Sequence, residues 1–234
     1  YNNILLPEPP SLFSNQKEMA PASRYQMNEI DNDLNITSDL FLGSIIKPIA
    51  NKSKALDIYQ NNLARMNEEQ FSTWQLLWRP QNEAYLRDIP TGEELLRWKY
   101  QRFAKNYLRC IQDVDENIGR FRSFYDQFST QECIFIYTAN QGRFLGENGW
   151  FGSQWMMEPT MRIPLSFTYI KSENTTHRKI EQNIQDIDLA PTILSLATSD
   201  NFENNHGISL NLEDWNSTIL NKRKELYFHH YDFP

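Results

Sequence analysis

Residues 133–153 read CIFIYTANQGRFLGENGWFGS, and this stretch says most about the fold. Its first six residues, Cys133 to Thr138, form an uninterrupted apolar run that is too short for a helix and rich in residues that favour strands. Such a run predicts a strand buried on both faces, the usual state in a parallel sheet. A polar loop follows over residues 139–151, with glycines at positions 142, 146 and 149. Because ligands bind beyond the carboxyl ends of strands in open α/β sheets, this loop is the first candidate for a functional site.

A long amphipathic helix is predicted before this strand, over residues 91–128. Its apolar residues recur every three or four positions and make one continuous stripe. Gly119 is the weak point of so long a helix, and we expect a bend or break there. A second strand is expected over residues 163–170, followed by a helix from Asp188 to Leu196. This order predicts an α/β layered fold with a mainly parallel sheet flanked by helices.

The N-terminal part shows weaker signals. Residues 1–50 contain four prolines among polar residues without a sustained period, which predicts extended chain that follows the surface. A short helix is predicted over residues 53–63. A further helix is predicted from Asn67, which with Gln70 resembles an N-terminal cap, and we expect it to end before Pro80.

Composition and charge exclude several classes of protein. The chain has 234 residues, of which 40% are hydrophobic, and a formal net charge of −7. That length and apolar content suit one ordinary folded domain, or most of a larger one. The acidic balance, without a basic stripe, argues against nonspecific binding to nucleic acid. No run approaches the ~18 apolar residues that a membrane-spanning helix needs.

Several segments, in consistent order and spacing, resemble the sulfatase family, especially bacterial sulfatases that act on sulfated glycans. These segments are residues 107–120, 138–150, 155–158, 161–165 and 186–194. The resemblance implies a fold like that of alkaline phosphatase and the hydrolysis of sulfate esters. It also implies a Ca²⁺ ion that holds the sulfate, a sulfated carbohydrate as substrate, and a periplasmic or secreted location.

The resemblance divides the chain into three parts. Residues 1–90 are expected to be an extended and short-helical segment of the sulfatase domain, residues 91–200 its central α/β portion, and residues 201–234 the start of the C-terminal sulfatase region. Family members take their nucleophile, a formylglycine, from a Cys/Ser-x-Pro-x-Arg motif and two Asp metal ligands from an N-terminal strand. The chain contains neither feature. We therefore expect a C-terminal fragment with an incomplete fold and no catalytic residue of its own.

Four residues of this chain match site positions of the family, and three of them depart from its pattern. Asn140 and Gln141 match calcium ligands, but Asn140 stands where the family has Asp. Asn148 replaces a usual His, and Ser153 stands where related enzymes have a lysine that neutralises the sulfate; both are assigned to substrate binding. An amide at position 140 lacks a full negative charge, which should weaken calcium binding. Loss of a preorganised transition-state donor costs ~2.7–4 kcal/mol.

These departures predict a catalytically impaired protein, and two alternatives remain open. One is an active, divergent sulfatase whose nucleophile lies upstream, in which Asn140 and Gln141 still bind calcium and another cation replaces the lysine. The other is a noncatalytic glycan-binding module. Arg143 and Arg162 could contact a sulfate, although Arg162 is expected to pair with a carboxylate. Tryptophans that could stack on sugar rings, at positions 74, 78 and 98, have the spacing typical of a helix core.

Overall fold

The structure, a computed structural model, describes residues 3–14, 18–24, 27–43, 54–128, 133–170, 179, 183–198, 206–210, 223 and 225–228. It divides into two compact units. The first unit comprises residues 1–130 with Arg143–Gln154, and the second comprises Gln131–Gly142 with residues 155–234.

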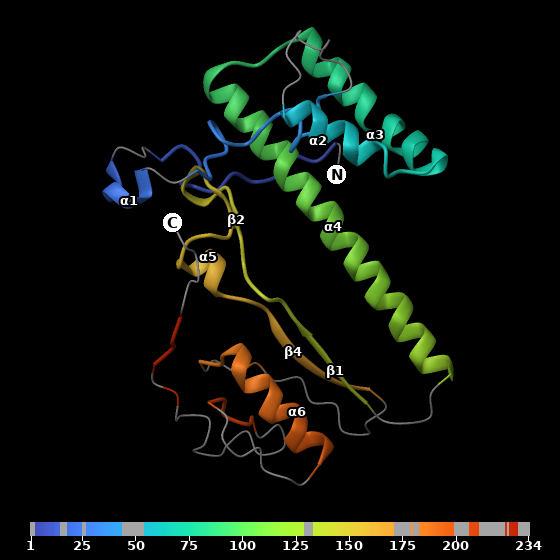
Figure 1. The fold of residues 1–234 in the computed structure, drawn as a ribbon, viewed down its shortest axis with the longest axis vertical. Coiled ribbons are helices and arrows are strands. Elements are labelled where there is room, and N and C mark those ends of the chain that lie inside the picture. The colour runs from blue at the N-terminus through green and yellow to red at the C-terminus, as the bar shows by residue number, and fades with distance from the viewer. Residues whose placement is uncertain are drawn as a thin grey trace. The chain divides into compact units, whose positions relative to one another are not determined.

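The helices of the first unit follow the apolar patterns of the sequence. They are α1 (Pro21–Arg24), α2 (Lys54–Leu63), α3 (Glu68–Arg87) and α4 (Gly92–Phe128) (Figure 1). The long helix predicted over residues 91–128 is confirmed. The expected break at Gly119 is wrong, because α4 continues through this residue. A glycine in a helix lowers stability by at most ~1 kcal/mol, which the neighbouring turns can absorb.

Helix α3 begins where the sequence predicts and ends later. Asn67 caps it: its side chain accepts a hydrogen bond from the Gln70 amide at 2.8 Å, and its own amide donates to the Gln70 side chain at 3.0 Å. The prediction that the helix ends before Pro80 is wrong. Proline removes one N–H from the helix ladder, and beside this gap the Gln81 side chain donates to the Leu77 carbonyl at 2.7 Å. The carbonyl that loses its amide donor at Pro80 is that of Leu76, four residues earlier, so α3 continues through Pro80 with one ladder hydrogen bond missing.

The chain before α2 is irregular but is not confined to the surface. A core cluster contains Leu12, Ile30, Leu34, Leu40, Tyr100 and Ala104. Side chains of α4 also satisfy backbone groups of the N-terminal segment. Gln101 bonds both the amide and the carbonyl of Leu6, at 3.0 and 2.8 Å, and the Tyr100 hydroxyl donates to the Pro7 carbonyl at 2.6 Å. The expectation of surface chain over residues 1–50 is therefore wrong for these residues, since proline content reports backbone geometry rather than burial.

A buried arginine joins α3, α4 and the N-terminal segment. The Arg102 guanidinium donates to the Leu40 carbonyl at 2.7 Å and to the Asn82 side chain at 2.6 Å. It also lies over the Trp78 ring, 4.2 Å from its centroid. Burial lowers the pKa of Arg102 to about 10, and the neighbouring Arg109 charge acts in the same direction. Trp78 is therefore part of the core, as its helical spacing indicates.

The second unit contains a two-stranded sheet and two described α-helices. Strand β1 (Cys133–Thr138) pairs with β4 (Leu165–Ile170), and the helices are α5 (Glu158–Met161) and α6 (Leu189–Ala197) (Figure 1). Both predicted strands and the helix after Asp188 are confirmed.

The direction of strand pairing differs from the expected parallel arrangement. Within the described residues, β1 and β4 are antiparallel, and β1 is only half-buried along its length. A parallel neighbour needs a long crossover, usually a helix, and the described helix between β1 and β4, α5, has only four residues. An apolar run predicts a strand well, but its partner's direction depends on the connection that follows.

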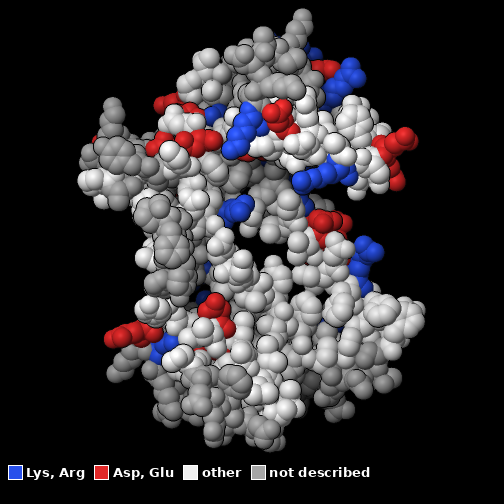
Figure 2. Space-filling view, in the orientation of Figure 1, with Lys and Arg blue, Asp and Glu red and all other residues white. Residues whose placement is uncertain are grey.

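Charged side chains of both signs are mixed on the surface of the described residues. On the face drawn in Figure 2, Lys and Arg side chains are scattered among Asp and Glu instead of forming a continuous basic stripe. Among the described helices, none combines the length and apolar character needed to cross a membrane.

Candidate functional site

The predicted site residues fall into two pairs. Asn140 and Gln141 follow β1 in the second unit. Asn148 and Ser153 belong to the first unit, where they lie in and just after the hairpin of β2 (Phe144–Leu145) and β3 (Phe151–Gly152). The structure thus places the predicted metal ligands on one loop and the predicted substrate-binding residues on one hairpin.

The loop that carries Asn140 and Gln141 is anchored by Gly142. The Gly142 amide donates to the Thr160 carbonyl of α5 at 2.9 Å. A Cβ atom at this position would lie 2.2 Å from the Pro159 carbonyl oxygen, so only glycine allows this approach. The glycine therefore fixes the backbone next to two exposed amide side chains.

The chemistry of Asn140 and Gln141 does not fit a calcium site by itself. Calcium takes six to eight oxygen ligands, and carboxylates supply the charge that gives high affinity. These two side chains offer neutral carbonyl oxygens from one exposed loop. In the segments that the structure describes, no group of three or more His, Cys, Asp or Glu residues could hold a metal ion.

The hairpin that carries Asn148 packs through two aromatic rings. Phe144 is paired with Gly152 across the strands, and both Phe144 and Trp150 are fully buried, with ring centroids 5.3 Å apart. The Gly146 amide donates to the Trp150 carbonyl at 2.9 Å and closes the turn between the strands. A rigid turn therefore presents residues 147–149.

Asn148 has a backbone conformation that explains its identity without a substrate. Its φ of 58° lies in the left-handed region, where Asn is among the few tolerated non-glycine residues. Its amide donates to the Ser11 hydroxyl at 2.9 Å. Next to it, the Tyr100 ring packs against Gly146. Burial raises the pKa of Tyr100, and the Glu147 and Glu8 charges add to this shift.

Ser153 directly follows β3, and Asn28 contacts the residues of this strand. The Asn28 carbonyl accepts from the Phe151 amide at 2.8 Å, and its side chain donates to Gln154 at 3.1 Å. Gly152 has a positive φ of 86°, and a Cβ there would lie 3.4 Å from the Asn28 side-chain oxygen. Sequence reasoning missed Asn28, because a contact this distant in the chain leaves no local pattern.

This chain is similar in sequence and in structure to known proteins. The family described as N-sulphoglucosamine sulphohydrolase, C-terminal, matches residues 146–234. An N-acetylglucosamine-6-O-sulfatase of Bacteroides thetaiotaomicron is 32% identical over 240 aligned residues; the alignment includes all of this chain and 42% of that protein. A solved structure of a protein in complex with its substrate D-glucosamine-2-N,6-O-disulfate matches with a TM-score of 0.77 and 30% identity. That match covers all of this chain and 47% of the solved chain.

The chain spans less than half the length of the relatives it matches. The structural likeness confirms the α/β class predicted from the sequence, as an incomplete version of the relative's fold with small sheets.

Proposed function

Because this chain is a relative of the sulfatases in both sequence and fold, we propose that it is part of a sulfuric ester hydrolase acting on sulfated glucosamine residues of glycans. The names of these relatives support this substrate class, since each refers to a sulphated glucosamine or to its desulfation. The proposal includes a periplasmic or secreted location, where such glycans would be encountered.

We further propose that this protein binds calcium weakly and turns over sulfate esters slowly. The observation that carries this proposal is the neutral, exposed Asn140 on a loop whose backbone Gly142 holds in place. A neutral carbonyl oxygen attracts a dication far less than a carboxylate does. The neutral Ser153 adds to the effect, because it offers no ammonium group to a sulfate.

Turnover of a defined sugar tests this proposal. The full-length protein, carrying its formylglycine, should release sulfate from glucosamine 6-sulfate at least ~100-fold more slowly than the N-acetylglucosamine-6-O-sulfatase of Bacteroides thetaiotaomicron, given the cost of one lost transition-state donor. Released sulfate would be followed by ion chromatography. Turnover close to that of the relative would contradict the proposed impairment. Absence of binding to any sulfated glucosamine would contradict the proposed substrate.

A further inference from the structure

Residues 28–30 run antiparallel beside β3. The Phe151 amide donates to the Asn28 carbonyl at 2.8 Å, and Glu29 pairs with Trp150 in an antiparallel bridge. Strand β3 is also paired with β2. This short strand is therefore held by two chain segments, one of which is far away from it in the sequence.

The Asn28 side chain extends this contact past the end of β3. Asn28 is 8% exposed, and its Nδ2 donates to the Gln154 Oε1 at 3.1 Å. Because the Asn28 carbonyl binds the Phe151 amide, one residue contacts the chain on both sides of Ser153. Gly152, within this stretch, has a φ of 86°, a conformation that favours glycine. Asn28 therefore limits where the backbone of Ser153 can lie.

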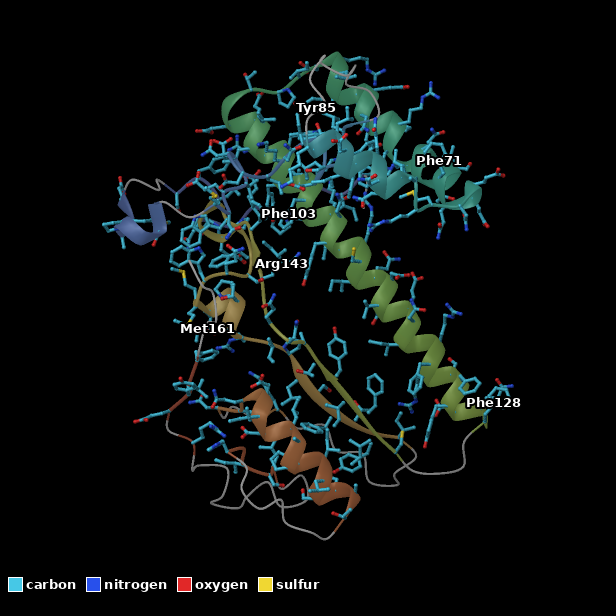
Figure 3. The ribbon with its side chains drawn as sticks, in the orientation of Figure 1. Phe71, Tyr85, Phe103, Phe128, Arg143 and Met161 are labelled. Atoms are coloured by element: carbon cyan, nitrogen blue, oxygen red, sulfur yellow. The ribbon has the colours of Figure 1, made fainter. Side chains whose placement is uncertain are left out.

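The hairpin also packs through aromatic rings. The Phe151 ring contacts the Phe103 ring of α4 with centroids 6.0 Å apart, and Phe103 is labelled in Figure 3. Trp150, just before β3, is fully buried, and its ring centroid lies 5.3 Å from that of Phe144. Neither of these ring contacts involves the Asn28 side chain. Substitution of Asn28 should therefore change the residues after β3 more than the hairpin itself.

We propose that Asn28 is a positioning residue for substrate binding and that it acts through its hydrogen bond with Gln154. This inference rests on the proposed function, in which Ser153 contributes to the substrate site. Loss of the hydrogen bond leaves Ser153 and Gln154 with more conformations in the unbound protein. Ordering these residues when the sugar binds lowers the affinity. The sugar then binds more weakly, although the buried Asn28 side chain does not touch it.

Steady-state kinetics of the full-length protein, carrying its formylglycine, test this inference. Asn28→Ala should raise the KM for glucosamine 6-sulfate about three- to tenfold, as expected for one or two side chains that must be ordered on binding. The kcat should stay within about twofold of wild type, because the ordering is complete in the bound complex. General unfolding of the variant would instead lower kcat and leave KM unchanged.

Asn32→Ala is a matched control. Asn32 belongs to the same segment of the chain, but its side chain is exposed and bonds the Glu29 side chain instead of the hairpin. This substitution should leave both KM and kcat unchanged.

A double-mutant cycle shows whether Asn28 acts through Gln154. Gln154→Ala removes the acceptor of the same hydrogen bond and should raise KM to a similar extent. The double variant Asn28→Ala/Gln154→Ala should then resemble the single variants, because the shared interaction can be lost only once. Increases in KM that add up in the double variant would overturn the inference, as would a wild-type KM in Asn28→Ala.

Failure of the proposed function would give a different result. If the wild-type protein neither binds nor hydrolyses glucosamine 6-sulfate, the proposed function fails, and hydrogen exchange decides whether Asn28 positions these residues. Mass spectrometry of the peptide that covers residues 151–155 should show faster exchange in Asn28→Ala than in wild type. Equal exchange rates in the two proteins would overturn the inference.

Discussion

Asp188→Asn should lower the free energy of unfolding by about 3–5 kcal/mol, because it breaks a buried ion pair and leaves the other charge without compensation. Asp188 is 1% exposed and pairs with the half-buried Arg223. Its two carboxylate oxygens also accept from the Ile208 amide at 2.8 Å and the Gln185 amide at 2.9 Å. One carboxylate thus fixes the start of α6 and two chain segments beside it. The Asn side chain of the variant has only one oxygen, so it cannot accept both hydrogen bonds.

Guanidinium denaturation followed by circular dichroism would measure this loss. A matched control is Glu158→Gln, which removes the carboxylate of an exposed ion pair with Arg162 in the same unit. Exposed pairs contribute about 0–1 kcal/mol, so the control should change stability little. Equal effects of the two substitutions would contradict the assignment of Asp188 as a buried anchor.

Gly146→Ala should destabilise the first unit by roughly 2–4 kcal/mol through backbone strain and overpacking together. Gly146 has a φ of 110°, and a Cβ there would lie 2.8 Å from the Tyr100 ring and 3.2 Å from Pro9. The ring cannot retreat freely, because its hydroxyl is bonded to the Pro7 carbonyl. The substitution should therefore also disturb the turn that carries Asn148.

Gly119→Ala should have the opposite effect on stability. No atom lies within 4 Å of a Cβ built at this position of α4, so alanine should raise stability by up to ~1 kcal/mol. Thermal unfolding monitored by circular dichroism compares both variants with wild type. A Gly146→Ala protein as stable as wild type would show that the Tyr100 contact does not constrain the turn.

Local signals in the sequence predict the helices and strands well. The apolar period identifies α4, the Asn67 and Gln70 pair marks the start of α3, and the short apolar run marks β1. Each of these features depends on neighbours within a few residues, which is why a single sequence contains them. Pro80 shows the limit of this approach, because α3 continues through a residue that removes one N–H from its hydrogen-bond ladder.

Long-range relations could not be predicted in the same way. Three features depend on how distant segments meet. They are the antiparallel pairing of β1 and β4, the burial of Leu40 against α4, and the hydrogen bond from the Phe151 amide of β3 to the Asn28 carbonyl. The sequence identifies the residues of the candidate site through family resemblance. The contacts that hold these residues in place can be found only in the structure.

Calcium titration of the full-length protein tests the central claim that a neutral side chain at position 140 weakens the metal site. Asn140→Asp should bind Ca²⁺ about tenfold or more tightly than wild type, because it restores a charged ligand. Asn62→Asp, which adds the same charge at an exposed position of α2, should not change the affinity. Isothermal titration calorimetry would measure all three proteins. Wild-type affinity equal to that of Asn140→Asp would contradict the claim.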